Sequence, residues 1–198
     1  DFDYEYVPNT PFTLGYAGDP GVHCNKERID LLIRAVCELN GAGYPCQLKL
    51  AGFEQSAFES EYPQITNDAF YRECVKYFGK ISHKDCLQLI HSVDYSVIVR
   101  EDQLVTRAGF PTKLSESFAC GTPVITTPSS NVAEFVLAGK CGIVTKDFSY
   151  ESIVEAIKYA MTAAREELLS LHSLVREDNH LEYGRYKNTI AAFIQQSQ

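Results

Sequence analysis

Several features that define common protein classes are missing from this chain of 198 residues. No apolar run approaches the roughly 18 to 20 residues of a membrane-spanning helix. The first residues, D-F-D-Y-E-Y-V-P, have neither the basic nor the apolar region of a signal peptide. Lys and Arg number 18 against 26 Asp and Glu, a formal charge of −8, which argues against a broad nucleic-acid or anionic-membrane surface. We expect a cytoplasmic protein that binds no nucleic acid.

Cysteine pairs and metal motifs are also missing. The seven cysteines are odd in number, widely spaced and without a C-x-x-C pair, and most lie in apolar contexts such as F-A-C-G. This pattern is typical of small buried side chains in a reducing compartment. We assign the cysteines neither a disulfide nor a metal, and no H-E-x-x-H motif suggests a metal elsewhere.

The common nucleotide and hydrolase motifs are absent as well. The first apolar run is followed by G-D-P-G-V-H, so the dinucleotide fingerprint G-x-G-x-x-G is not there, and neither is a P-loop or a G-x-S-x-G elbow. Hydride-transfer enzymes and P-loop phosphotransferases are therefore disfavoured. The sequence predicts no cofactor.

Short apolar runs do alternate with amphipathic segments along the chain. Such alternation predicts a parallel sheet with helices on both faces. The fold class is α/β, a Rossmann-like doubly wound parallel sheet of about six strands, with further helices at the C-terminus. We expect a flexible lead or linker at 1–11 and a single domain at 12–198. The predicted strands lie within 12–18, 46–52, 73–79, 93–99, 123–126 and 139–145. The predicted helices lie within 26–40, 83–92, 106–121, 130–138 and 148–161, with a partly helical segment at 54–69 and two helices after 164, separated by a break near 178–180.

The stretch 106–130 is the centre of this organisation. It reads T-R-A-G-F-P-T-K-L-S-E-S-F-A-C-G-T-P-V-I-T-T-P-S-S, which predicts a loop, a short helix carrying Lys113 and Glu116, a stop at Gly121 and a buried strand. A helix N-terminus offers unpaired N–H groups and a partial positive charge. In a doubly wound sheet, ligands bind beyond the carboxyl ends of the strands. Phosphate is the expected ligand.

Five motifs then occur in the order of a known family. They are Y-A-G-D-P-G-x-x-x-x-K, L-K-L-A-G, Y-F-G-K-I-S-H-K-D, A-G-F-P-T-K-L-S-E-S-F-A-C-G-T-P-V-I-T-T and A-E-F-V-x-x-G-x-x-G-I-V. The chain resembles the C-terminal, nucleotide-sugar-binding half of GT-B glycosyltransferases of the family 4 type. The resemblance implies that an N-terminal acceptor domain is absent from this sequence.

The resemblance also implies roles for single residues. Glu116 would accept both ribose hydroxyls of the donor nucleotide, and Lys26 would neutralise the diphosphate; these two are the expected catalytic residues. Backbone near Gly109 and Phe110 would approach the diphosphate. The amides of Thr112, Lys113 and Leu114 would face it. Further contacts are expected from Gly18 in the first loop, from Gly79, Lys80 and Ile81 beside the nucleobase, and from Arg107.

Two positions depart from the family pattern. Ala108 stands where a glutamate that touches the donor sugar is expected, and Asp19 stands where many members have a phosphate-binding arginine. Lys113, Arg107 or Arg100 are candidates to compensate. Other interpretations remain open at this stage, since Lys113 could be an exposed first-turn residue and Arg107 could pin its loop. His83 and His91 are expected to be cap or surface residues.

The resemblance implies a retaining, metal-independent glycosyltransferase that moves a sugar from a nucleoside diphosphate to an acceptor glycan or lipid-linked glycan, in surface or capsular polysaccharide synthesis. A full-length protein of this kind could lie at the inner face of the membrane, and the isolated fragment is expected to be inactive. Two alternatives stay open. One is a nucleotide-sugar epimerase of the same architecture, and the other is a non-catalytic nucleotide-sugar-binding module.

Overall fold

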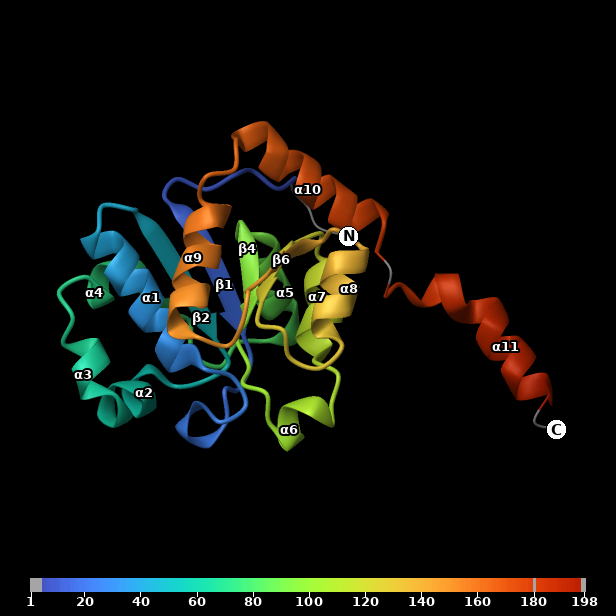
Figure 1. Ribbon diagram of the computed structural model, residues 1–198, viewed down its shortest axis with the longest axis horizontal. Helices are drawn as coiled ribbons and strands as arrows, with labels where there is room; N and C mark the ends of the chain where they lie inside the picture. The colour runs from blue at the N-terminus through green and yellow to red at the C-terminus, as the bar shows by residue number, and fades with distance from the viewer. Residues whose placement is uncertain (1–4, 180, 197–198) are drawn as a thin grey trace.

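A single parallel sheet forms the centre of the computed structural model, which describes residues 5–179 and 181–196 (Figure 1). The sheet has six strands in the order β3-β2-β1-β4-β5-β6, and every pair is parallel. The predicted doubly wound sheet is therefore confirmed. The strand order reverses between β1 and β4, which makes this pair the switch point of the fold. The strands are β1 (Phe12–Ala17), β2 (Cys46–Ala51), β3 (Val75–Tyr77), β4 (Tyr95–Ile98), β5 (Val124–Thr126) and β6 (Gly142–Val144).

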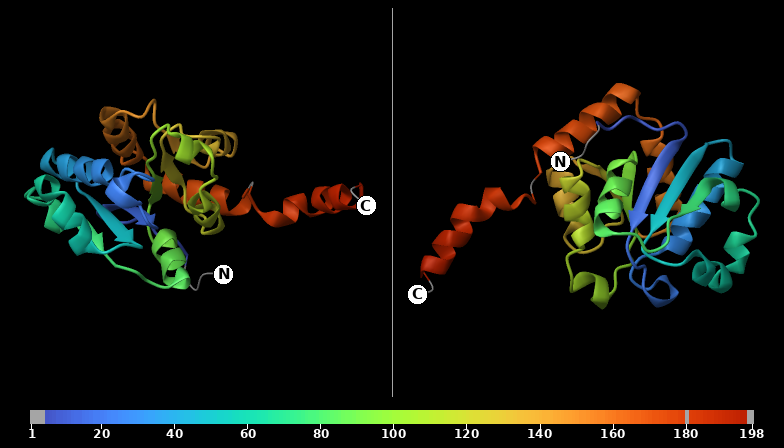
Figure 2. Two further views of the ribbon diagram at one scale, coloured as in Figure 1. Left: turned by 90° about the horizontal axis from the view of Figure 1, so that it is seen from below. Right: turned by 180° about the vertical axis from the view of Figure 1, so that it is seen from behind.

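Helices cover both faces of this sheet (Figures 1 and 2). On one face α1 (Ile29–Gly41) packs against α9 (Tyr150–Ala160), and on the other α5 (His83–His91) contacts α7 (Thr112–Ala119). Apolar strand residues such as Leu14 and Leu48 are fully buried between the two layers. The remaining α-helices are α2 (Gln55–Glu61), α3 (Pro63–Thr66), α4 (Tyr71–Cys74), α6 (Leu104–Arg107), α8 (Val132–Ala138), α10 (Arg165–Glu177) and α11 (Lys187–Gln196). Two short 3-10 helices are η1 (Val22–Cys24) and η2 (Tyr183–Tyr186).

Local signals placed most helix ends correctly. Ser149 caps α9 by accepting a hydrogen bond from the Ser152 amide, and Gly121, with φ of 70°, follows the end of α7 as predicted. Helix α8 begins later than the predicted segment 130–138, because Ser130 has φ of 52° and Asn131 takes the N-cap position without a side-chain bond.

Two segments differ from the sequence prediction. The expected strand at 73–79 is shorter, because Glu73 and Cys74 belong to α4. The chain just before α7, where the sequence predicts a loop from 106 onwards, contains the single turn α6, whose first turn is capped by Gln103 and Thr106. Both differences arise from i-to-i+3 contacts that hydrophobic periodicity does not reveal.

The lead before β1 lies against the domain. Tyr6 is buried and its ring stacks on His172 with centroids 3.4 Å apart. The Asn9 amide donates to Asp94 Oδ1 at 2.9 Å. Residues 5–11, which we expected to be flexible, are thus held by a buried carboxylate, while 1–4 lie outside the described residues.

Of the two C-terminal helices that the structure describes, α10 packs on the domain and α11 does not pack on the sheet. The ring of His172, on α10, donates from Nε2 to the Asp94 carbonyl at 2.9 Å, so α10 packs on the domain. α11 extends away from the sheet (Figures 1 and 2). The chain leaves α10 at Asp178, within the predicted break, and position 180 lies outside the described residues.

All seven cysteines carry free thiols; six are buried, as predicted, and Cys86 is half-buried. In the part of the chain that the structure describes, no helix is both long and apolar enough to cross a membrane.

Candidate functional site

The candidate site lies at the carboxyl ends of β1, β4 and β5, where the strand order reverses. Helix α7 begins there after Pro111, which serves as N-cap without a side-chain bond. Leu114 and Phe118 are fully buried on one face of α7, so the amphipathic pattern leaves Lys113 and Glu116 on the face towards the site. The predicted loop, helix and buried strand are all present.

The first turn of α7 supplies fewer amides than expected. The Leu114 amide donates to the Pro111 carbonyl at 3.0 Å, which corrects its predicted role as a phosphate donor. No hydrogen bond from the Thr112 or Lys113 amide is found among residues 5–179 and 181–196. Two amides at a helix start remain to receive an anion.

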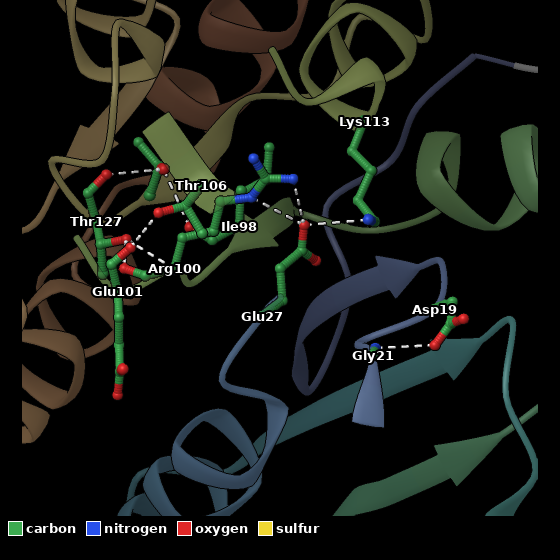
Figure 3. A network of polar contacts seen from close by, with 10 residues as sticks. Asp19, Gly21, Glu27, Ile98, Arg100, Glu101, Thr106, Lys113 and Thr127 are labelled. Carbon is green, nitrogen blue, oxygen red and sulfur yellow. Dashed lines mark hydrogen bonds and ion pairs between the residues drawn. The ribbon is translucent and has the colours of Figure 1, made fainter. Parts of the chain in front are cut away.

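A buried carboxylate, which sequence reasoning missed, lies beneath the site (Figure 3). Glu27 is 0% exposed, and its Oε1 accepts from Lys113 Nζ at 3.0 Å. The same oxygen accepts from Arg100 Nε at 3.2 Å and from Arg100 Nη2 at 3.1 Å. Glu27 Oε2 and the Tyr16 hydroxyl are buried without a hydrogen-bond partner in the described part of the chain. Burial and the nearby Glu27 raise the pKa of Tyr16.

Arg100 is fixed at its backbone as well as at its side chain. Its amide donates to Thr127 Oγ1 at 2.9 Å, and that hydroxyl donates to the Arg100 carbonyl at 2.7 Å (Figure 3). The side chain lines a cavity of about 210 Å³ together with Lys26, Thr106, Gly109 and Phe110. The structure therefore brings the predicted residues Lys26, Gly109 and Phe110 together and adds Arg100 to them.

Arg107 does not join this cavity. Its guanidinium makes two bonds of 2.6 Å to Asp102 and is 61% exposed. The bond from Arg107 lowers the pKa of Asp102. In this structure Arg107 therefore holds its own loop through Asp102, and its contact with phosphate stays a prediction.

Glu116 has a neighbour that sequence reasoning did not anticipate. Its Oε1 lies 3.2 Å from Nε2 of His83, the first residue of α5. Ser82 is the cap of this helix, because its hydroxyl accepts from the Asp85 amide at 3.2 Å. His83 is exposed, as expected, whereas His91, expected to be a cap or surface residue, is buried. Glu116 remains 37% exposed at its side chain, so ligand hydroxyls can reach its carboxylate.

Two glycines bring neighbouring loops close to the site. A Cβ on Gly18 would lie 2.2 Å from Lys113 Cε, and the φ of 151° at Gly18 also favours glycine in this loop. Gly79 accepts a bond from the Gly52 amide at 2.8 Å, which holds the loop after β3 at the same edge. Lys80 is exposed beside it. Ile81 lines a separate groove of about 430 Å³ with Phe78 and Lys49.

The charges of the site favour an anion. Lys26, Arg100 and Lys113 contribute three cations against the carboxylates of Glu27 and Glu116, and the free amides of α7 add to the positive side. Asp19 uses its carboxylate in its own turn, accepting from the Gly21 amide at 2.8 Å. Within the described residues, no group of three or more His, Cys, Asp or Glu is placed to hold a metal ion. Metal independence stays a prediction.

Comparison with known proteins agrees with this geometry. The family model described as glycosyl transferases group 1 matches residues 21–171. The fold is similar to HepE of Anabaena in complex with UDP and glucose (TM-score 0.71, 16% identity, 93% of this chain and 48% of that chain). It is also similar to sucrose-phosphate synthase of Thermosynechococcus elongatus (TM-score 0.71, 18% identity, 98% and 45%). A third similar structure is WaaG, a glycosyltransferase involved in lipopolysaccharide biosynthesis (TM-score 0.66, 18% identity, 88% and 44%).

This chain spans less than half the length of these three structures. No curated protein matches it. The family match confirms the resemblance drawn from the five motifs, and the solved structures confirm the Rossmann-like fold. The chain belongs to the family of glycosyl transferases group 1.

Proposed function

We propose that this chain is the donor-binding domain of an enzyme that transfers a sugar from a nucleoside diphosphate sugar to an acceptor. The observation that carries the proposal is the arrangement of Lys113 and Arg100, both held by Glu27, beside two free amides of α7. Membership of the group 1 family supports it. A diphosphate would complete the charge balance of this edge of the sheet.

The proposed chemistry is stabilisation of a leaving diphosphate. As the bond from the anomeric carbon to the β-phosphate oxygen breaks, negative charge grows on the phosphate. Fixed cations and N–H groups stabilise that charge without reorganising. Lys26 and Arg100 line the cavity beside Gly109 and supply two of these cations. Glu116 would hold the ribose through charge-assisted hydrogen bonds, each contributing about 1.5 to 3 kcal/mol.

We infer the remaining details from the resemblance. The reaction would retain the anomeric configuration, transfer a hexose and serve surface or capsular polysaccharide synthesis. The acceptor glycan or lipid-linked glycan would bind a second domain, so this chain alone would bind the donor and transfer nothing. A cytoplasmic location fits the six buried cysteines, since free thiols persist in a reducing compartment.

Calorimetric titration with UDP, GDP and ADP, in the presence of EDTA, tests the proposal. UDP is the natural first ligand because the structure of HepE contains it. We expect saturable, one-to-one binding of at least one diphosphate, weakened by salt because ion pairs contribute. Absence of saturable binding by all three at millimolar concentration would overturn the proposed function.

A full-length protein separates this proposal from an epimerase. If product analysis of a full-length protein shows that the donor sugar is converted without any acceptor, the epimerase assignment replaces sugar transfer.

A further inference from the structure

Glu27 occupies an unusual position for a carboxylate next to an anion site. It is fully buried, yet both cations that it binds reach the surface of the site. The Arg100 side chain is 13% exposed and the Lys113 side chain is 21% exposed. Arg100 lines the cavity that contains Lys26, while Lys113 lines a smaller one that contains Glu116. Glu27 is therefore the shared anchor of two neighbouring parts of the site (Figure 3).

The hydrogen-bond geometry leaves donors available for a ligand. A guanidinium has five N–H groups and an ammonium has three. Glu27 Oε1 takes two bonds from Arg100 and one from Lys113. Among residues 5–179 and 181–196, no other hydrogen bond from these two side chains is found, so their other N–H groups remain for an anion. Glu27 thus fixes the direction of the two cations without using up their capacity to bind.

Fixing these side chains in advance has a clear physical benefit. Lys and Arg have long side chains with many rotamers, so each loses much conformational entropy when it becomes ordered. If Glu27 already orders them, a diphosphate does not have to supply that free energy on binding. The carboxylate also keeps two like charges close together, which would otherwise repel each other.

We propose that Glu27 is a positioning residue, which holds Arg100 and Lys113 in place for the diphosphate of the donor. It acts through these cations and does not touch the ligand itself. The proposal rests on the proposed function. It attributes part of the site's affinity for diphosphate to a carboxylate that orders the two phosphate-binding cations. A purely structural Glu27 would instead stabilise the fold without any preference for phosphate.

Glu27→Gln separates the two roles, because it keeps the shape of the side chain and removes its charge. Asp30→Asn is the matched control. Asp30 is a buried carboxylate of the same segment, bound by Arg28 at 2.9 and 2.7 Å, and it lines neither of the two cavities. Affinities are measured on the 198-residue chain by calorimetry for the diphosphate that binds best, and by ligand-observed NMR for its nucleoside.

We expect Glu27→Gln to weaken diphosphate binding at least tenfold and nucleoside binding less than twofold, and Asp30→Asn to change neither by more than twofold. An unchanged or tighter diphosphate affinity in Glu27→Gln would overturn the positioning role. An equal loss for the nucleoside would overturn it too. If the unvaried chain binds no diphosphate, the proposed function fails and this inference fails with it.

A second variant covers the case in which Glu27→Gln does not fold. Glu27→Asp keeps the charge and shortens the side chain by one methylene, which withdraws its carboxylate from the positions that Arg100 and Lys113 now contact. We expect a threefold to tenfold loss for the diphosphate, with the nucleoside unchanged. Full diphosphate affinity in folded Glu27→Asp would contradict the proposal.

Discussion

Two buried carboxylates at opposite ends of the sheet are satisfied in opposite ways. Asp94, just before β4, is 0% exposed. Its Oδ1 accepts from the Tyr6 hydroxyl and from Asn9, and its Oδ2 accepts from the Thr13 amide at 2.6 Å. Glu27, also 0% exposed, receives two cations on one oxygen and nothing from the described residues on the other.

The difference separates a structural role from a functional one. Both oxygens of Asp94 accept hydrogen bonds from neutral donors in the lead and β1. These donors lie away from the candidate site. The partners of Glu27 are charged, partly exposed and able to bind an anion. Asp94 therefore stabilises the fold, whereas Glu27 orients cations for ligand binding.

Removing Asp94 should produce the largest change in stability. Asp94→Ala leaves the Tyr6 hydroxyl and the Thr13 amide buried without an acceptor, and each such group costs about 1 to 3 kcal/mol. We expect the free energy of unfolding to fall by more than about 3 kcal/mol in urea denaturation. A fall of less than about 1 kcal/mol in the free energy of unfolding would show that Asp94 does not stabilise the packing of the lead.

The free energy of unfolding should also fall in acid, because His172, which binds the Asp94 carbonyl, is buried in its neutral form. Burial lowers the pKa of His172 from the usual 6.5 to about 4. The folded state therefore holds the neutral ring, and the unfolded chain binds the proton more readily. Stability from this group is present above pH 6.5 and is lost as the pH falls towards 4, by roughly 2 to 3 kcal/mol.

Urea denaturation of the unvaried chain and of His172→Gln, at pH 7 and at pH 4.5, measures this effect. We expect the difference between the two pH values to shrink in His172→Gln, because the substituted amide does not titrate. An equal acid loss in both proteins would assign the effect to other groups.

Glu116 should affect binding far more than stability. We expect Glu116→Gln to weaken diphosphate binding more than tenfold in calorimetry, because a neutral amide makes weaker hydrogen bonds to ribose hydroxyls. The free energy of unfolding should change by less than about 1 kcal/mol, because the side chain is 37% exposed. Unaltered affinity would remove Glu116 from the site.

Lys113 and Arg107 should differ in their effect on diphosphate affinity. Lys113→Met removes a cation held towards the site and should weaken diphosphate binding about fivefold, with a smaller salt dependence. Arg107→Met, the matched control, removes a cation already paired with Asp102 and should change affinity less than twofold. The reverse ranking would place the phosphate beside α6.

The sequence predicts the fold well because its signals are local. Gly121 and Ser149 mark helix ends through their own backbone and side-chain chemistry. Periodicity identifies buried strands such as β1, since burial on both faces demands apolar residues throughout. Ser130 is the exception, because a positive φ turned a good capping residue away from α8.

The site was less predictable because its key contacts are long-range. Glu27 and Lys113 lie 86 positions apart, and nothing in K-E-R-I-D marks this glutamate as buried. Arg100 and Arg107 look equivalent in the sequence, and only the three-dimensional positions of Thr127 and Asp102 distinguish them. The motif resemblance supplied Lys26 and Glu116, whereas the carboxylate that organises the cations required the structure.

A structure of the chain with its preferred nucleoside diphosphate bound is the most direct test of the contrast between the two carboxylates. We predict phosphate oxygens within hydrogen-bond distance of Arg100 and Lys113, with both cations still on Glu27, and no change around Asp94. A nucleotide bound instead in the cavity of about 500 Å³ beside Tyr62 and Tyr150 would contradict the account.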